Sequence, residues 1–281
     1  MTVDTDQKFR DYAIRSYRYL RLAIVVMVLS LGASVVIERG DAACWQGSIS
    51  AYFYTPARSM FVGALVAIGV CLIAIVGRTP WEDMFLNIAG MLAVVVALVP
   101  TSLADRLCAV TVKTKVPAEV DASINNNILA VAIGGAIALA IAMFIASKKS
   151  SIRLRTPSKE AGAGIALTGV LILAGVIWHS VARTGFDEHA HVGAAIAMFL
   201  AIGAVVVLNV REAAAGYRVL YIAVVGFMVA GVVAVVIGKA IDASWRHEVF
   251  WLEALEITPF AVFWVAQTIE HWDEGITLPG V

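Results

Sequence analysis

The sequence is poor in charge, and this bounds the class of protein. Lys, Arg, Asp and Glu make up 15% of the 281 residues, whereas soluble domains have about 25%. Hydrophobic residues reach 60% and the mean hydropathy is +0.86, as expected of a membrane protein. The net charge is zero, and there is no basic tail, heptad array or zinc-knuckle spacing. Nucleic-acid binding therefore has no support in the sequence, and no nucleic-acid partner is expected.

Several catalytic signatures are also missing. The sequence has no Gly-rich phosphate loop, no GxSxG elbow and no HExxH pair. Its last hydrophobic stretch has no lysine that could carry a retinal Schiff base. The sequence therefore leaves open whether the protein is an enzyme.

Long apolar stretches dominate the chain. A transmembrane helix needs about 20 mostly apolar residues, and eight stretches qualify. They predict one all-α integral membrane domain over residues 1–281, a polytopic helix bundle with about eight spans and a cytoplasmic N-terminal segment at 1–19. The predicted spans are 20–37, 59–77, 83–100, 125–147, 160–182, 190–209, 217–241 and 248–270.

Basic residues set the predicted orientation, because cytoplasmic loops are enriched in Lys and Arg. With the N-terminus inside, the inner segments carry thirteen of these residues and the outer segments carry eight. The loop KKSSIRLR is the strongest part of this bias. We therefore expect both termini in the cytoplasm and a multi-pass protein in the plasma (inner) membrane. Its expected partners are membrane lipid and other membrane proteins or a second copy of the chain.

The three cysteines occupy different places in this topology. Cys44 and Cys108 fall in two outer loops, and Cys71 falls inside the second span. Because the outer face is oxidising, Cys44 and Cys108 could form a disulfide. Two unrelated thiols are the alternative, since spacing does not fix connectivity. We expect Cys71 to be a buried packing residue.

The last predicted span, FWLEALEITPFAVFWVAQTIEHW, carries polar residues that are costly in a membrane. At about 100° per residue, Glu253, Glu256, Gln267 and Glu270 fall within about 100° of one another on the helix. Such a stripe must face the bundle or a wet cavity, because lipid cannot satisfy it. For Glu270, at the cytoplasmic interface, a structural role is favoured.

Glu253 and Glu256 are therefore the first candidates for ligand or ion binding. Pro259 removes one backbone donor and frees the carbonyl of Leu255 beside them, which favours a proton or cation site. Hydrogen bonding to neighbouring helices is the structural alternative for both glutamates.

The second predicted span supplies a cation and a row of small residues. Arg58 at its outer mouth is a candidate partner for an outer carboxylate, with snorkelling to the headgroups as the alternative. Ser59, Gly63 and Ala67 are spaced four apart, which predicts a helix-packing face.

Four of the five histidines fall on the predicted outer side. His179 ends the fifth span, His189 and His191 begin the sixth, and His247 begins the eighth. His179 and His191 are candidates for ligand binding. Together with His189 and an outer carboxylate they could also hold a metal ion, the only cofactor that the sequence indicates. No helical i, i+4 pair is present, so interfacial histidines that cap helices and meet carboxylates are the favoured alternative.

At the inner start of the third span, Thr79 or a nearby residue can cap the helix. Glu82 and Asp83 in the first turn favour the helix dipole, and this structural role is sufficient to explain both acids.

Four runs together resemble a family of uncharacterised bacterial multi-pass integral membrane proteins, mainly from actinomycetes. They are SISAYFYTPARSMFVGALVAIGVCLI, EDMFLNIAGMLAVVVALVPTS, HVGAAIAMFLAI and VFWLEALEITPFAVFWVAQTIEHW. The resemblance implies about eight helices in the plasma membrane and no particular activity. In outline the chain also resembles ceramidase-like membrane hydrolases, which pair a metal held by three histidines with nearby Ser and Asp. It departs from them in the final helix, where Glu253 and Glu256 stand in place of paired histidines.

These features predict a plasma-membrane protein that binds or transports a proton, a cation or a small amphiphile in an outer-facing polar cavity. Arg58, Glu253, Glu256 and the outer histidines would line that cavity. The alternatives are a non-catalytic partner in an envelope membrane assembly and a metal-dependent lipid hydrolase. No inverted repeat is visible in the sequence, which counts against a conventional secondary transporter.

Overall fold

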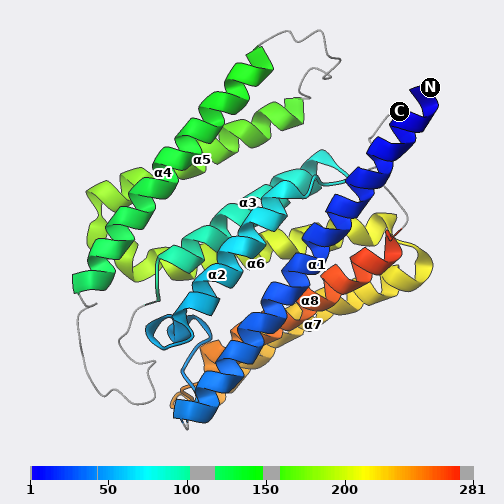
Figure 1. The fold of residues 1–281 in the computed structure, drawn as a ribbon. Coiled ribbons are helices and arrows are strands. Elements are labelled where there is room, and N and C mark those ends of the chain that lie inside the picture. The colour runs from blue at the N-terminus through cyan, green and yellow to red at the C-terminus, as the bar shows by residue number, and fades with distance from the viewer. Residues whose placement is uncertain (1, 43, 102–117, 148–158, 273–281) are drawn as a thin grey trace.

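The computed structural model describes residues 2–42, 44–101, 118–147 and 159–272 (Figure 1). Within these residues all secondary structure is helical, which confirms the all-α part of the predicted fold class. The helices, in chain order, are α1 (Thr2–Ala42), the 3-10 helix η1 (Ser50–Tyr54), α2 (Arg58–Ala74), α3 (Pro80–Leu98), α4 (Ala118–Ser147), α5 (Lys159–Val181), α6 (Arg183–Glu212), α7 (Ala215–Ile241) and α8 (Glu248–Glu270).

In the described part of the chain, six helices are long and apolar enough to cross a membrane: α1, α3, α4, α6, α7 and α8. Two further apolar helices are shorter, namely α2 with its 17 residues and the segment Ala166–Val181 of α5. Each predicted span coincides with, or largely overlaps, one of the α-helices. The helices therefore indicate a multi-pass membrane protein.

The start of α1 and the end of α8 lie at the same end of the bundle, which we call the terminal end. There the Arg18 Nε donates a hydrogen bond of 2.6 Å to the carbonyl of Trp272. At the opposite end, which we call the loop end, the segment before η1 meets the start of α8. The backbone N–H of Phe250 donates to the carbonyl of Gly47 there, at 2.9 Å.

Helices α3 and α6 run antiparallel between these two ends. At the terminal end, Asn209 near the end of α6 donates to Glu82 at the start of α3, at 2.8 Å. At the loop end, His191 near the start of α6 lies 2.6 Å from the carbonyl of Val99, which follows α3. Each contact joins groups that the sequence separates widely, so both ends of the bundle are fixed by polar bonds.

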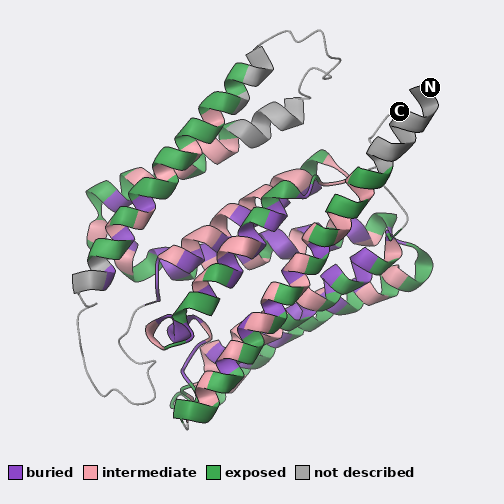
Figure 2. Cartoon of the chain, viewed as in Figure 1, coloured by how far each residue is buried: buried purple, intermediate pink, exposed green. Residues whose placement is uncertain are grey.

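The main bundle consists of α1, α2, α3, α6, α7 and α8, and α4 and α5 lie as a pair at its side (Figure 1). Buried residues concentrate in the main bundle, whereas the described faces of α4 and α5 are largely exposed (Figure 2). One apolar core lies toward the terminal end and contains Trp264 and Phe260. A second lies toward the loop end and contains Tyr52 and Phe250. Because α8 contributes to both cores, the segment between Phe250 and Phe260 lies where they meet.

Two glycines determine how closely α2 and α3 pack. A Cβ atom on Gly69 would lie 2.6 Å from the carbonyl oxygen of Gly90, and one on Gly90 would lie equally close to that of Gly69. The backbones are therefore in direct contact, which only glycine permits. The predicted packing face is wrong, because Ser59 and Gly63 are exposed and a Cβ on Gly63 would meet nothing within 4 Å.

The start of α3 agrees with the prediction. The Thr79 side chain accepts a hydrogen bond of 3.2 Å from the backbone N–H of Glu82, and Pro80 occupies the first turn. The Glu82 Oε2 accepts one of 2.8 Å from the N–H of Arg78. Exchanged bonds of this kind satisfy donors that a helix start leaves unpaired.

Candidate functional site

Helix α8 turns its polar stripe toward the bundle, as the sequence predicts. Glu256 and Gln267 are buried, at 5% and 2% exposure. Pro259 lies inside the helix, so the carbonyl of Leu255 lacks its usual helical donor. The hydroxyl of Thr258 donates to the neighbouring carbonyl of Ala254 at 2.8 Å. The helix therefore continues through the proline with one backbone acceptor left over.

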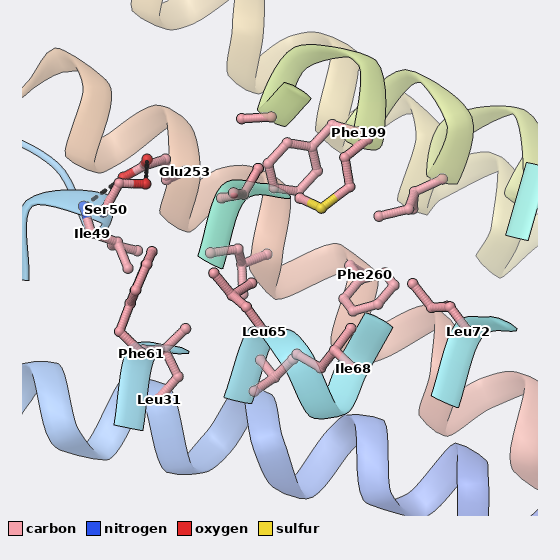
Figure 3. Close-up of a pocket in the computed structure, with 16 residues that line it drawn as sticks. Leu31, Ile49, Ser50, Phe61, Leu65, Ile68, Leu72, Phe199, Glu253 and Phe260 are labelled. Atoms are coloured by element: carbon pink, nitrogen blue, oxygen red, sulfur yellow. Dashed lines mark hydrogen bonds between the residues drawn. The ribbon is translucent and has the colours of Figure 1, made fainter. Parts of the chain in front are cut away.

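Glu253 binds the segment that precedes η1 (Figure 3). Its Oε2 accepts hydrogen bonds from the backbone N–H of Ile49 at 2.5 Å and of Ser50 at 3.2 Å. Its Oε1 accepts one of 2.6 Å from the Ser50 hydroxyl. These N–H groups stand at the start of η1, where they lack helical partners, and an anion there is favoured electrostatically. Glu253 therefore caps η1 and ties it to α8.

Glu256, one turn further along α8, has a different environment. Its side chain is buried, and its Oε1 has no hydrogen-bond partner in the described part of the chain. No ion pair joins it to a cation among the described residues. An unpaired carboxyl group in an apolar interior is energetically costly. Glu256 is therefore a candidate for a functional rather than a structural acid.

Arg58 has other contacts than the predicted ones. Its Nε donates to the carbonyl of Phe53 at 2.7 Å, and its guanidinium lies over the Phe53 ring, 4.4 Å from the ring centre. Arg58 forms no ion pair with Glu253 or Glu256 in the part of the chain that the structure describes. The residue thus anchors η1 to the start of α2, and its role in ligand binding stays a prediction.

The loop-end histidines are spread over different environments. His179 is buried and packs edge-to-face on Phe186, with ring centres 5.1 Å apart. His191 is buried and its Nδ1 donates to the carbonyl of Val99, whereas His189 is exposed. No group of three or more His, Cys, Asp or Glu side chains that could hold a metal ion occurs among the described residues. The metal site at His179, His189 and His191 therefore stays a prediction.

The cysteines bear on the topology rather than on the site. Cys71 is a buried free thiol, as predicted. Cys108 lies outside the described residues, so its pairing with Cys44 also stays a prediction.

A narrow cavity of about 50 Å³ lies beside Glu253, between α1, α2, α3, α6 and α8 (Figure 3). Glu253 and Ser50 are the polar residues of its lining, and apolar side chains such as Phe61, Phe199 and Phe260 form the rest. The cavity thus differs from the predicted polar cavity, because the Glu253 carboxylate is already bonded to η1 and Glu256 does not line it.

The loop end is closed by aromatic side chains of η1. The hydroxyl of Tyr54 donates to the carbonyl of Thr101 at 2.8 Å. Burial raises the pKa of Tyr54 to about 12, and the Arg58 charge opposes this shift only in part. Burial also raises the pKa of Tyr52. Both phenols therefore stay neutral at physiological pH, and the Tyr54 hydroxyl ties η1 to Thr101.

Nearer the terminal end, two buried amides and a carboxylate form a chain of hydrogen bonds that joins three helices, which we call the amide chain. The Gln267 Nε2 donates to the Asn209 Oδ1 at 3.0 Å, and the Asn209 Nδ2 donates to the Glu82 Oε1 at 2.8 Å. All three residues are less than 5% exposed. Glu82 is therefore more than the helix-start residue that the sequence predicts, since it also anchors α6 and α8 to α3.

Glu270 bonds to α7 at the same end of the bundle. Its Oε1 accepts from the backbone N–H of Ala214 at 2.8 Å, and its Oε2 accepts from the Tyr221 hydroxyl at 2.6 Å. Beside it, His271 accepts a hydrogen bond of 3.0 Å from Arg78. The structural role predicted for Glu270 is confirmed, although the residue joins α8 to α7 rather than reaching toward the surface.

Arg21 of α1 is the buried cation of this end. It is 8% exposed, interacts electrostatically with Glu82, and lies over the ring of Tyr17 at 5.8 Å. Its Nε has no hydrogen-bond partner in the described part of the chain. Sequence reasoning missed both Arg21 and Asn209. Their signal was a polar residue inside an apolar run, the same signal that identified Glu253 and Glu256.

The chain matches no protein-family model, no curated protein and no solved structure.

Proposed function

We propose that this protein spans the plasma membrane with eight helices and binds a proton at Glu256, which it passes along α8. One observation carries the proton site: the Glu256 Oε1 is buried and lacks a hydrogen-bond partner in the described part of the chain. The proposal selects the proton from the ligands that the sequence predicts.

The environment of Glu256 favours a proton over other ligands. An ionised carboxylate that is buried without a partner is disfavoured by several kcal/mol, and a bound proton removes that charge. A proton needs a single oxygen atom, whereas Mg²⁺ or Ca²⁺ needs about six or more ligands. Glu253 cannot share the ligand, because its oxygens are bonded to Ile49 and Ser50. Glu256 is therefore the acid that can gain and lose a proton without breaking a bond.

Other unsatisfied polar atoms on α8 suggest how the proton would move. In the described residues, the Glu248 Oε2, the Trp264 Nε1 and the Gln267 Oε1 are buried without partners. At 1.5 Å per residue, the four residues that carry these atoms and the Glu256 Oε1 follow one another along the helix axis at about 12, 12 and 5 Å. Buried polar groups of this kind are usually satisfied by ordered water. Water would carry the proton between the loop end and Gln267, while the Trp264 N–H, which only donates, and the Gln267 oxygen, which only accepts, would hold that water in place.

The contact between Arg18 and Trp272 supports an even number of spans, because the start of α1 and the end of α8 then lie on the same side of the membrane. Six and eight spans both meet this condition, so the length of α2 bears on the choice. Helix α2 covers about 26 Å at 1.5 Å per residue, close to the hydrocarbon thickness of about 30 Å. We take all eight helices as spans and, because basic residues favour the cytoplasm, place the terminal end inside.

Proton flux through reconstituted protein tests the function. Liposomes that contain the wild-type protein and a pH-sensitive dye should respond to a K⁺ diffusion potential faster than protein-free liposomes. Glu256→Gln keeps the shape of the side chain but cannot release a proton, so its flux should fall to the protein-free rate. Glu188→Gln is the matched control, because Glu188 is an exposed carboxylate at the loop end. Wild-type flux that Glu256→Gln leaves unchanged would contradict the proposal.

Infrared spectroscopy separates proton binding from transport. A carbonyl band of a protonated carboxyl group should be present in the wild-type protein and absent from folded Glu256→Gln. A band without flux would restrict the function to proton binding. The absence of any difference band would overturn the proton site itself.

The two alternative functions stay predictions with measurements of their own. A metal-dependent lipid hydrolase requires bound metal, which elemental analysis of the purified protein detects. A non-catalytic partner in an envelope assembly requires proteins that copurify in mild detergent. No observation in the described residues favours either of them over proton binding.

A further inference from the structure

A groove of about 380 Å³ runs between α1 and α8 on the outer surface of the bundle. It extends from Val28 to Val36 on α1 and from Phe250 to Thr258 on α8, about 12 Å along each helix. Its floor includes the buried Val28, whereas Val36 at its rim is 61% exposed. The groove is therefore apolar, elongated and open to the lipid that surrounds a membrane bundle.

Arg39 stands at the loop end of this groove. It lies within about 40° of Val28, Gly32 and Val35 on the surface of α1, and so extends the groove-lining face by one turn. Its guanidinium lies over the ring of Trp45, 5.5 Å from the ring centre, and Trp45 itself lines the groove.

Arg39 retains an unused donor. Its Nε is buried and has no hydrogen-bond partner in the described part of the chain, and no carboxylate of those residues forms an ion pair with it. Arg39 lies in the last turn of α1, where the helix dipole favours a positive charge. This attraction gives the Nε no hydrogen-bond partner. A guanidinium group binds phosphate oxygens well. Tryptophan is enriched at the level of the lipid headgroups, so Trp45 would place Arg39 where lipid phosphates lie.

We propose that this groove binds one acyl chain of an anionic phospholipid and that Arg39 binds the phosphate of its headgroup. The apolar groove accounts for the chain, and Trp45 holds Arg39 at the boundary between chain and headgroup. The Arg39 guanidinium, with which no carboxylate of the described residues forms an ion pair, accounts for the headgroup. The site lies in the leaflet at the loop end. It does not depend on proton binding at Glu256.

Native mass spectrometry of the purified protein tests this site with two probes of equal chain length. Phosphatidylglycerol should be retained about fivefold more than phosphatidylcholine, as expected when one basic side chain attracts an anionic lipid. In Arg39→Gln this preference should disappear. Arg246→Gln is the matched control, because Arg246 is an exposed arginine at the same end that lies outside the groove.

A second variant tests the acyl-chain part of the site. A Cβ on Gly32 meets nothing within 4 Å, so the side chain of Gly32→Leu starts in open space and occupies part of the groove. It should reduce the retention of both lipids. Gly63→Leu adds the same bulk on α2, also in open space but outside the groove, and should have no effect. Equal retention of the two lipids by the wild-type protein, or an unchanged preference in folded Arg39→Gln, would overturn the proposal.

Discussion

Glu253 and Glu256 stand one helical turn apart, yet their oxygens have opposite surroundings. Glu253 accepts three hydrogen bonds from Ile49 and Ser50, whereas the Glu256 Oε1 accepts none in the described part of the chain. The difference comes from the segment before η1, which reaches one carboxylate. At the scale of the residue, the two acids are thus distinguished by their bonding partners rather than by their depth in the helix.

The capping role of Glu253 predicts a large loss of stability on truncation. Glu253→Ala should lower the free energy of unfolding by about 2–3 kcal/mol, because it leaves the part-buried N–H groups of Ile49 and Ser50 unsatisfied. Ser50→Ala should cost about 1 kcal/mol, and the double variant should cost less than the sum, since the two share a bond. Reversible unfolding in mixed micelles measures these values.

Glu188→Ala serves as the control for this cycle and should change stability by less than about 0.5 kcal/mol, because Glu188 is exposed. Strict additivity of the Glu253 and Ser50 variants would show that they do not interact.

The sequence could identify both glutamates but not their partners. A carboxylate in an apolar run is visible in the residues themselves, and helical periodicity places it on the bundle side. Arg58 was paired with these acids by its position in the topology, whereas in the structure it turns to the Phe53 carbonyl. The path of the chain through η1 decides which acceptor Arg58 reaches, and no periodic pattern encodes that path.

At the scale of the element, α1 extends over Thr2–Ala42, well beyond its predicted span of 20–37, because the membrane bounds only the apolar part of a helix. The positions of the helices along the chain were nevertheless predictable, since apolar length is a direct requirement of the membrane. The packing face of α2 was not. Three small residues at spacing four suggested one face, but the close approach occurs at Gly69 against Gly90. Small residues are common on both faces of this helix, so spacing alone cannot select between them.

The contact between α2 and α3 predicts opposite effects for two glycine variants. Gly69→Ala should lower stability by about 1–3 kcal/mol, because its Cβ would meet the Gly90 carbonyl at 2.6 Å. Gly63→Ala should be neutral or stabilising by up to about 1 kcal/mol, since it improves helix propensity in open space. Thermal unfolding in detergent compares the two. Equal effects would contradict the direct backbone contact.

At the scale of the whole molecule, the proposed topology has a direct test. In intact cells a membrane-impermeant maleimide should label Arg246→Cys at the loop end. It should label Gly216→Cys at the terminal end only after permeabilisation. Both positions are exposed, so access depends on the side of the membrane.

Labelling of the wild-type chain supplies the background, and this labelling should rise after reduction if Cys44 and Cys108 are paired. The reverse pattern of labelling would invert the proposed orientation.

The shortness of α2 has a consequence for the lipid around the protein. Its 17 residues cover about 26 Å, a few ångströms less than a typical hydrocarbon core, and the exposed Val70 and Ile73 show that this helix faces outward. The bonded η1 segment at its loop end leaves α2 no room to lengthen. In the proposed eight-span topology the bilayer would therefore thin beside α2, and hydrophobic mismatch would enrich shorter-chain lipids there. The lipids that surround α2 should therefore change with the thickness of the bilayer.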